Sequence, residues 1–531
     1  MNSMKWLDYL AILLYLCGVA TIGVWVGRRQ RTTSEFFVAN RRLPGWAVSF
    51  SIIGTAISSV SFVALPGAAF AKDWHLIVPN LTVPLVLVLV TLVIVPFYRR
   101  VIGMSSYEYL ERRFGIGARL YGSFGFLLLR TVDLGFTLLL TAIAVEVLTG
   151  WDIRYVIAGV GLFTLIYTLI GGIEAVVWND VLQGIVLVTG MLLVLALALF
   201  RPEGGPLAVL SMGYRHGKFS LGDYSLTWQS LFAETPTVWI FILVGLSHFG
   251  RSYMIEQNMV QRYLVARTDR EAQRATLIGA LLCVVIWVTF TTIGSSLWAF
   301  YQITGETLPA TMVQKPDNIL PYFVATQFPQ GMVGLLLAAI LAAAMQAFSA
   351  DLTSVATVAT QDYFARFLPK SSDRARLMFG RCAVFIGGLL ATGVALQLTR
   401  QRTRAVYEIF VVLAAVLAGG MLGLFASAFL STRTTARGIY VGISSCLLFV
   451  LWATVTGPLN VDLGFNFTMN PIMIGVIGHP LLFVVAYFSS LVLGGKRTDL
   501  AGLTIWDLRN HPREVSEDDR GEVKPSQASH V

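Results

Sequence analysis

Charged residues are scarce in this sequence of 531 residues. Asp, Glu, Lys and Arg together make up only 13% of the chain, about half of their usual share in a soluble domain. A long chain with so little charge cannot cover a water-exposed globule with polar surface. This shortage argues against a soluble enzyme or binding domain as the main body of the protein.

Cysteine is also rare, and its pattern points to no chemistry. Each cysteine lies inside an apolar run, and none belongs to a C-x-x-C motif: Cys17, Cys283, Cys382 and Cys446. We expect them to be small buried apolar residues, without a disulfide or a metal site. The apolar runs also lack an H-E-x-x-H motif and a recognisable nucleophile–base pair, so we expect no enzyme and no catalytic residue.

Apolar blocks long enough to cross a bilayer are abundant instead. Hydrophobic residues make up 56% of the chain, and the mean hydropathy is +0.70. A membrane-spanning helix needs about 20 consecutive, mainly apolar residues. We predict thirteen spans, at 6–27, 45–71, 76–98, 118–149, 154–172, 175–200, 235–254, 273–300, 331–363, 377–398, 405–430, 436–456 and 471–494. The sequence therefore predicts an all-α protein that crosses a membrane many times.

The basic residues fall in alternate loops between these spans. The net charge of +9 and the pI near 9.4 would suit a nucleic-acid partner, but arginines in short loops are what the positive-inside rule expects of a membrane protein. With thirteen spans, one side receives the arginines of 28–42, 99–113, 262–274, 366–376 and 433–437, and only 400–404 deviates. We expect the cell inner (plasma) membrane, an outside N-terminus, a cytoplasmic C-terminus and no nucleic-acid partner.

Two spans contain residues that interrupt helices. The first carries Gly54–Ser61 followed by Pro66-Gly67, and the second carries Gly245–Ser252, five spans later. Interrupted helices at matching positions of two halves predict an inverted repeat with a binding site near the midplane; the alternative is a pair of ordinary small-residue packing faces. We predict one transporter domain over 1–495, with core repeats at about 45–200 and 235–430. The polar tail over 496–531 is expected to be disordered and cytoplasmic.

Several stretches, taken together and in order, resemble the sodium/solute symporter family, which includes sodium/glucose, proline and sialic acid transporters. They are Ser58–Phe62 with Pro66-Gly67, Tyr107–Gly115, Gly171–Gln183, Glu256–Tyr263 and Gln361–Tyr363. The resemblance implies a ten-helix core of five plus five inverted helices, with one helix before and two after. It also implies sodium-coupled symport of a small polar organic solute, such as a sugar or sugar acid, by alternating access. Sodium would be the coupling ion, with no other cofactor.

The resemblance places one sodium ion between the break of the first core helix and the eighth core helix. It implies the carbonyls of Gly54 and Ile57, and the positions of Ala343, Gln346 and Ala347. Most members carry Ser or Thr at the last two positions, and hard cations prefer several oxygen ligands. We therefore expect this first site to be weakened or remodelled.

The resemblance also implies a second sodium site at Asp180, with Gln346, Ser349 and Ala350 as its partners on the eighth core helix and Asp351 directly after them. A carboxylate inside a membrane is costly and usually functional. The alternatives are that Asp180 lies at a cytoplasmic helix end and that Asp351 is a salt-bridge partner for another helix.

Solute contacts are expected from Ser58, Ser61, Asn80, Asp133, Arg251 and Tyr253. Sialic acid transporters have a substrate-binding arginine where Asp133 aligns, and this reversal of charge argues against the same substrate. Asp133 shares a helix face with Arg130 through its i, i+3 spacing. It is expected either to pair with Arg251 or to meet a cationic or hydroxyl-rich solute.

Other functions stay open at this stage. Asp180 or Asp351 would also suit proton coupling, and transport without a coupling ion is a further alternative. A solute-sensing membrane protein is less favoured, because the residues after 495 leave little room for a signalling domain. The sequence does not identify the solute, the ion stoichiometry or the oligomeric state.

Overall fold

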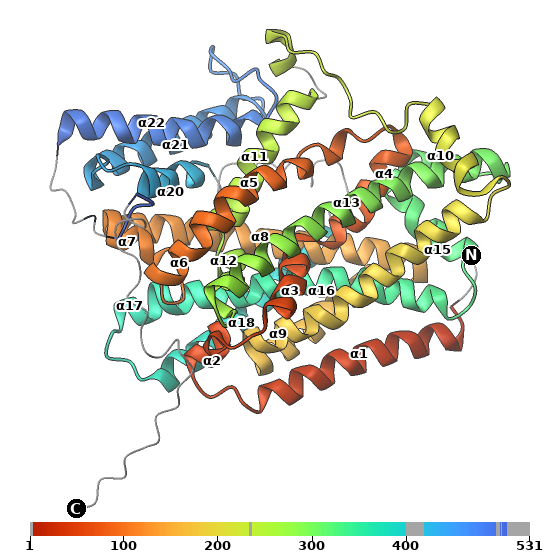
Figure 1. Ribbon diagram of the computed structural model, residues 1–531, viewed down its shortest axis with the longest axis horizontal. Helices are drawn as coiled ribbons and strands as arrows, with labels where there is room; N and C mark the ends of the chain where they lie inside the picture. Colours follow the sequence, from red (N-terminus) through yellow and green to blue (C-terminus); the bar gives the residue numbers. More distant parts are fainter. Residues whose placement is uncertain (1–3, 233–235, 400–418, 495–499, 501, 507–531) are drawn as a thin grey trace, which may run out of the picture.

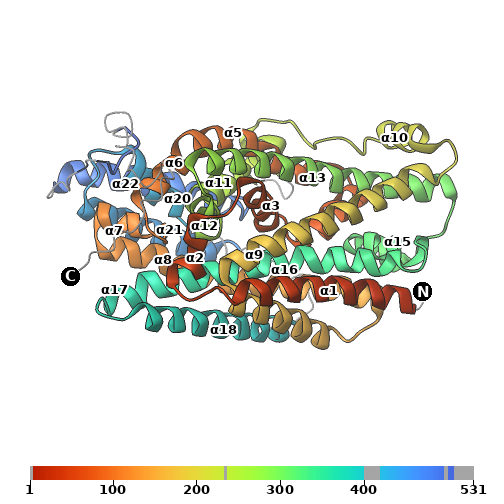
Figure 2. The ribbon, with the colours of Figure 1, turned by 60° about the horizontal axis from the view of Figure 1, so that its bottom comes forward.

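The computed structural model describes residues 4–232, 236–399, 419–494, 500 and 502–506. Within these ranges every regular element is a helix, and Figure 1 shows most of the long helices running side by side. Figure 2 shows α1 lying along α16, with which it is in contact. Helix α16 is the buried centre of the bundle, because every one of its residues from Leu336 to Val358 is buried.

The helices of the first half are α1 (Trp6–Gly27), α2 (Thr33–Val38), η1 (Ala39–Arg41), α3 (Gly45–Ala56), α4 (Ser59–Ala71), η2 (His75–Ile77), η3 (Asn80–Thr82), α5 (Val83–Leu89), η4 (Val90–Ile94), α6 (Val95–Val101), α7 (Glu108–Phe114), α8 (Ile116–Thr149), α9 (Ile153–Phe200), α10 (Gly205–Arg215) and η5 (Trp228–Phe232).

The second half contains α11 (Val238–Ile255), α12 (Gln257–Val265), α13 (Asp269–Thr304), α14 (Ala310–Gln314), η6 (Pro316–Asn318), α15 (Ile319–Gln327), α16 (Met332–Val358), η7 (Ala359–Phe364), α17 (Ala365–Phe367), α18 (Asp373–Leu398), α20 (Met421–Leu430), α21 (Ala436–Thr456) and α22 (Met473–Leu493).

The described residues contain nearly all of the predicted spans. Ten stretches are long and apolar enough to cross a membrane, and α3 with α4 forms an eleventh that bends by 57°. Helix α9 is 48 residues long and is broken at Gly172, so it accounts for two predicted spans and brings the number to twelve. Of the remaining one, 405–430, only the end is described, as α20; residues 400–418 lie outside the described part. The all-α membrane fold is confirmed.

Gly172 is the point at which the chain turns between the spans predicted at 154–172 and 175–200. Its backbone has φ 57° and ψ −156°, a region open almost only to glycine. A Cβ atom at this position would lie 2.7 Å from the carbonyl oxygen of Phe36. The break therefore requires glycine twice, for its conformation and for the close approach of α2.

The first interrupted span breaks where the sequence predicts. Helix α3 ends at Ala56, Ile57 and Ser58 are extended with ψ of 117° and 170°, and α4 begins at Ser59. The carbonyls of Gly54 and Ile57 accept no backbone hydrogen bond from the residues that the structure describes. Two polar groups at membrane depth are thus left for another partner.

The second break lies further along than predicted. Gly245–Ser252 is helical throughout, and α11 ends only at Ile255, where Glu256 is extended with ψ 129°. A Cβ atom on Gly245 would lie 2.4 Å from the carbonyl oxygen of Pro79. This glycine allows close packing of α11 on the neighbouring span, so the prediction of a break at Gly245–Ser252 is wrong.

Two smaller expectations also need correction. Cys17 and Cys382 are exposed rather than buried, since they lie on outward faces of α1 and α18; all four cysteines are free. In the tail expected to be disordered, residues 502–506 pack on the bundle: Ile505 N–H donates to Phe429 O at 3.2 Å, and Trp506 Nε1 donates to Leu430 O at 2.8 Å. Apolar side chains within this polar tail explain the attachment.

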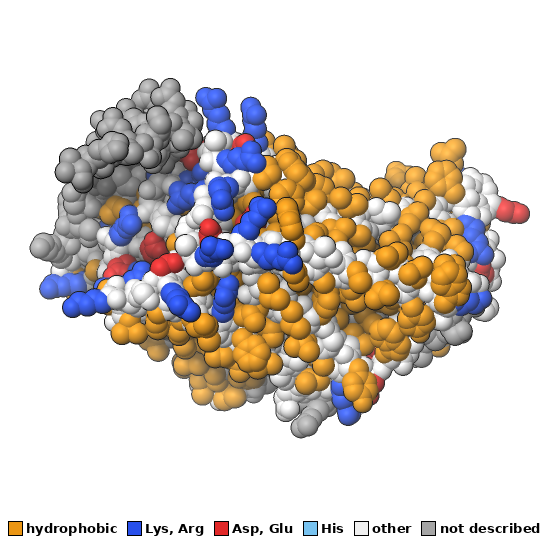
Figure 3. Space-filling model, turned by 90° about the horizontal axis from the view of Figure 1, so that it is seen from below, with side chains coloured by type: hydrophobic (Ala, Val, Ile, Leu, Met, Phe, Trp, Pro, Cys, Tyr) orange, Lys and Arg blue, Asp and Glu red, His pale blue; other side chains and the backbone are white. Residues whose placement is uncertain are grey.

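The outer surface fits a bilayer. Figure 3 shows a broad band of hydrophobic side chains and, at one end of the bundle, a gathering of Lys and Arg side chains. This arginine-rich end is the one at which α7 and α17 lie in Figure 1. A hydrophobic band beside a basic end is the expected surface of a multi-pass membrane protein.

Candidate functional site

The break between α3 and α4 lies against the buried helix α16. A Cβ atom on Gly54 would be 2.9 Å from Cδ of Gln346, so the amide of Gln346 fills the space that glycine leaves open. Gln346 Nε2 in turn donates to the backbone carbonyl of Asp180 on α9, at 2.9 Å. The structure therefore brings together residues that the sequence assigned to ion binding from three separate spans.

Several oxygen atoms of these residues have no hydrogen-bond partner among the described residues. Gln346 Oε1 and Asp180 Oδ1 are buried and accept no hydrogen bond from the described residues. The carbonyls of Gly54 and Ile57, which accept no backbone hydrogen bond from the described residues, lie at the end of α3, where the helix dipole is negative. Buried acceptors are normally satisfied, and a group of unsatisfied oxygens is what a hard cation needs.

Asp180 has two neighbours that the sequence analysis did not single out. Its Oδ2 accepts a hydrogen bond from Ser51 Oγ at 2.5 Å. The same hydroxyl accepts one from Nε of Arg262 at 3.2 Å, and this arginine is fully buried. Arg262 therefore offsets part of the charge of Asp180 through a shared serine. The signal was present in the Glu256–Tyr263 motif, which contains Arg262.

The remaining predicted ion-site residues lie along α16, all of them buried: Ala343, Ala347, Ser349 and Asp351. Ser349 Oγ donates to the carbonyl of Gln346 at 3.1 Å, within its own helix. Asp351 faces a different group, because it accepts from Asn258 Nδ2 at 2.8 Å and pairs with Arg130 at 3.3 Å. The alternative interpretation of Asp351, as a salt-bridge partner for another helix, agrees with these contacts.

A second cluster of charged side chains surrounds Arg130 of α8. Its guanidinium pairs with Asp133 at 2.7 Å, with Asp351 at 3.3 Å and with Glu256 at the break between α11 and α12. Glu256 also pairs with Arg251. We call these five residues the charge cluster. Two arginines face three carboxylates, which leaves one negative charge uncompensated when all are ionised.

The expected direct pair between Asp133 and Arg251 is not formed. Asp133 pairs within its own helix, and Arg251 pairs with Glu256. The reason is the position of the second break, which places the Glu256 carboxylate between the two arginines. Sequence reasoning missed Glu256, although it begins the Glu256–Tyr263 motif.

Access to the charge cluster is uneven. The Asp133 side chain is 31% exposed, whereas those of Arg130, Arg251, Glu256 and Asp351 are 14% exposed or less. Ser58 and Ser61 are half-buried at the first break, and Asn80 is half-buried at the start of η3. Tyr253 is fully buried, with its ring centroid 6.2 Å from that of Phe249. Asp133 is thus the most exposed member of the charge cluster.

Two further motifs meet in an ion-pair network at the arginine-rich end. Arg119 pairs with Glu111 of α7 and with Asp362 of η7, each at 2.6 Å, and Arg366 pairs with Glu111 at 2.8 Å. Partial burial raises the pKa of Glu111, but the hydrogen bonds from Arg119 and Arg366 outweigh it and hold the pKa below its usual value. The 107–115 and 361–363 stretches therefore join separate elements of the bundle.

Comparisons with known proteins agree with this architecture. The model of the sodium:solute symporter family matches residues 36–445. The chain is 31% identical over 491 residues, 92% of this chain and 94% of the relative, to the sodium/sialic acid symporter NanT of Aliivibrio fischeri. It is 25% identical over 474 residues, 85% of this chain and 86% of the relative, to the sodium/glucose cotransporter of Vibrio parahaemolyticus.

Solved structures give the same picture. A Na+-coupled sialic acid symporter in a substrate-bound, outward-open state superposes with a TM-score of 0.84 and 29% identity, over 92% of this chain and 98% of that chain. Mhp1, a nucleobase-cation-symport-1 family transporter, shares the fold alone, with a TM-score of 0.55 and 14% identity over 91% of this chain and 97% of that chain.

Interrupted helices that carry polar groups in the middle of a multi-span bundle are typical of secondary membrane transporters. The chain belongs to the sodium:solute symporter family. It is therefore a multi-pass membrane transporter in a family of sodium-coupled symporters.

Proposed function

We propose that this protein carries a small polar organic solute, such as a sugar or sugar acid, across the plasma membrane together with sodium, by alternating access. The observation that carries the proposal is the contact of Gly54, Gln346 and Asp180 from three spans, where Gln346 Oε1 and Asp180 Oδ1 are buried without a hydrogen-bond partner among the described residues. Hard cations favour such ligands.

The first sodium site would use the carbonyls of Gly54, Ile57 and Ala343, with Gln346 Oε1 in place of the family's hydroxyl groups. Ala347 offers no side-chain oxygen, so this site would be weak on its own. A second ion beside Asp180 would gain a carboxylate, with Ser349 close by on α16. We propose that these two places supply the coupling.

The solute would bind beside the charge cluster, because Asp133 is its accessible member. Ser58, Ser61 and Asn80 would add hydroxyl and amide groups that can bind a sugar, and Arg251 would attract an acidic group. Two relatives are named sialic acid symporters, which supports a sugar acid, whereas the carboxylate of Asp133 supports a neutral or amino sugar, so all three stay candidates. Tyr253, which is fully buried, would contribute packing beneath the solute site rather than an exposed contact.

The test is uptake by proteoliposomes that contain the purified chain. A labelled neutral sugar, a sugar acid and an amino sugar are offered with and without an inward sodium gradient. We expect at least one of them to accumulate only with the gradient, and potassium replacement to abolish accumulation. Accumulation to the same level without sodium would rule out sodium coupling.

Proton coupling is the second candidate, favoured by the excess carboxylate of the charge cluster. An intramembrane carboxylate without full compensation is a typical proton carrier. The same proteoliposomes with an inward proton gradient and no sodium distinguish the two, because only a proton-coupled protein accumulates solute under that condition.

A further inference from the structure

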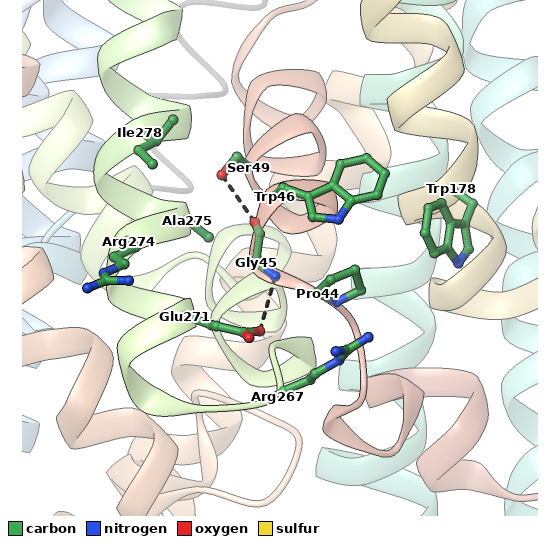
Figure 4. Close-up of a pocket in the computed structure, with 10 residues that line it drawn as sticks. All are labelled: Pro44, Gly45, Trp46, Ser49, Trp178, Arg267, Glu271, Arg274, Ala275 and Ile278. Carbon is green, nitrogen blue, oxygen red and sulfur yellow. Dashed lines mark hydrogen bonds between the residues drawn. The ribbon is translucent and has the colours of Figure 1, made fainter.

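A pocket of about 670 Å³ lies away from the charge cluster, between α3, α9 and α13. It includes Pro44, Gly45 and Trp46 at the start of α3, Trp178 of α9, and Arg267, which precedes α13. Figure 4 shows the residues at the start of α3 between those of α13 and Trp178 of α9. The start of α3 follows the arginine-containing 28–42 loop, so the pocket belongs to the arginine-rich end of the bundle.

One wall of the pocket is aromatic. The rings of Trp46 and Trp178 meet at an angle of 67° with their centroids 5.6 Å apart, and Figure 4 shows the two indoles on the same side of the hollow. Trp46 is 56% exposed, so much of its indole ring lies on the outer surface of the bundle. Tryptophans gather where a protein meets the interface between lipid headgroups and acyl chains.

The side chains that line the pocket carry a net positive charge, from Arg267 and Arg274 against Glu271. Arg267 Nε donates to Arg42 O at 2.8 Å, and its Nη atoms have no hydrogen-bond partner among the described residues. Within the same ranges, Arg274 forms no ion pair. The acidic residue of the lining, Glu271, accepts a hydrogen bond from the backbone N–H of Gly45 at 3.1 Å, as Figure 4 shows. The site is therefore suited to an anion.

An exposed apolar stripe continues from the pocket along α13. Ile278, Leu282 and Val285 are 51%, 43% and 58% exposed and lie on one helix face by their spacing. The stripe leads away from Arg267 toward the middle of the span. A ligand that combines an anionic head with a long apolar chain matches both parts.

We propose that this pocket binds an anionic phospholipid. Its phosphate lies at Arg267, its glycerol region lies against Trp46 and Trp178, and an acyl chain follows the α13 stripe. Basic pockets between spans on the cytoplasmic side bind anionic headgroups for the same reason. Because α3 also carries Gly54, the lipid contacts the half-helix that forms the ion site.

Native mass spectrometry of the full-length chain in detergent tests this, with phosphatidylglycerol as the probe and phosphatidylcholine as the uncharged comparison. One cation near the headgroups contributes about 1 kcal/mol, so Arg267→Gln is expected to weaken phosphatidylglycerol binding about fivefold. Arg267→Lys should keep most of the binding. The matched control is Arg270→Gln, which removes an exposed arginine in the first turn of α13, outside the pocket.

Equal phosphatidylglycerol binding by the Arg267→Gln and Arg270→Gln proteins would overturn the proposal, as would equal binding of phosphatidylcholine by the unaltered chain. Displacement of the lipid by free glycerol 3-phosphate at similar concentration would overturn it too, because the pocket would then be a site for a soluble phosphate. If Arg267→Gln fails to fold, Arg274→Gln and Trp178→Leu test the same rim and wall, with weaker binding expected for both.

Discussion

Gln346 stands where the family resemblance leads us to expect a hydroxyl side chain, and its amide fills the space beside Gly54. Its Nε2 is engaged with the carbonyl of Asp180, which leaves Oε1 as the atom free to accept. In the proposed sodium site, a glutamine held in this orientation would replace a short hydroxyl ligand by a longer amide ligand. The expected remodelling of the first sodium site would therefore consist of one amide oxygen, Oε1 of Gln346, in place of a hydroxyl oxygen.

The first prediction concerns this amide. Gln346→Leu keeps nearly the same volume but removes Oε1, so the sodium concentration for half-maximal uptake should rise about tenfold, equivalent to about 1.4 kcal/mol. Ala347→Ser adds an oxygen one residue along and should lower it. The sodium dependence of uptake by proteoliposomes measures both. An unchanged sodium dependence in Gln346→Leu would show that the amide is not a ligand.

The second prediction concerns Asp180. Asp180→Asn removes the carboxylate and leaves Arg262 without the charge that it offsets through Ser51. Sodium-driven accumulation should fall by tenfold or more, on the order of the loss of one charged ligand, while solute binding at saturating sodium changes less. Accumulation and equilibrium binding of labelled solute are measured side by side. Normal accumulation in the variant would exclude an ion role.

The third prediction concerns Glu256, which bridges Arg130 and Arg251. Glu256→Gln removes the ion-pair partner of Arg251, whereas Arg130 keeps Asp133 and Asp351. Removing one partner of a buried pair typically costs about 3–5 kcal/mol, so the melting temperature in detergent should drop clearly. Asp133→Asn should have a smaller effect, because its side chain is partly exposed. Arg251→Gln should partly rescue Glu256→Gln, and purely additive effects would argue that the two side chains act independently.

At the level of elements, the two breaks show what sequence reasoning can and cannot reach. The first was placed correctly, because a run of small and hydroxyl residues from Gly54 to Ser61 is followed by Pro66. The second break lies at Glu256, after the predicted Gly245–Ser252. A glycine such as Gly245 has the same sequence signal whether it ends a helix or allows two helices to pack closely. That choice depends on Pro79, which lies far away in the chain.

The charge cluster could not be assembled from sequence for a related reason. Arg130 and Asp133 were recognisable as a local pair through their spacing, but Glu256 joins them only after α8 and α11 have packed. Contacts of this kind depend on tertiary arrangement and leave no periodic signal. The motifs identified where such residues lie without indicating which of them pair.

The fourth prediction tests the break in α9. Gly172→Ala forces a side chain into a backbone region that costs about 1–3 kcal/mol and against the carbonyl of Phe36. We expect a lower melting temperature in detergent. Gly159→Ala, in the same helix α9, is the matched control, because a Cβ atom at Gly159 would have no contact within 4 Å. It should leave the melting temperature unchanged or raise it slightly. Equal effects of the two substitutions would contradict the need for glycine at the break.

At the scale of the whole molecule, the distribution of charge predicts orientation. The described residues account for twelve of the thirteen predicted spans, and the arginines gather at one end of the bundle. By the positive-inside rule we expect that end to face the cytoplasm.

The fifth prediction follows from this count. With thirteen spans the N-terminus lies outside and the C-terminus in the cytoplasm. A reporter that is active only outside the cell should work when fused to the N-terminus and fail at the C-terminus, and a cytoplasm-specific reporter should show the reverse. Termini on the same side would contradict the odd number of spans.

The contact between Gly54 and Gln346 also has an evolutionary consequence. The two positions share one small volume, so a side chain added at 54 leaves no room for glutamine at 346. Lineages descended from a common ancestor can enlarge one position only after the other has shrunk. Positions 54 and 346 should therefore covary among related sequences. Steric room, and not only sodium affinity, determines which of the two positions changes first.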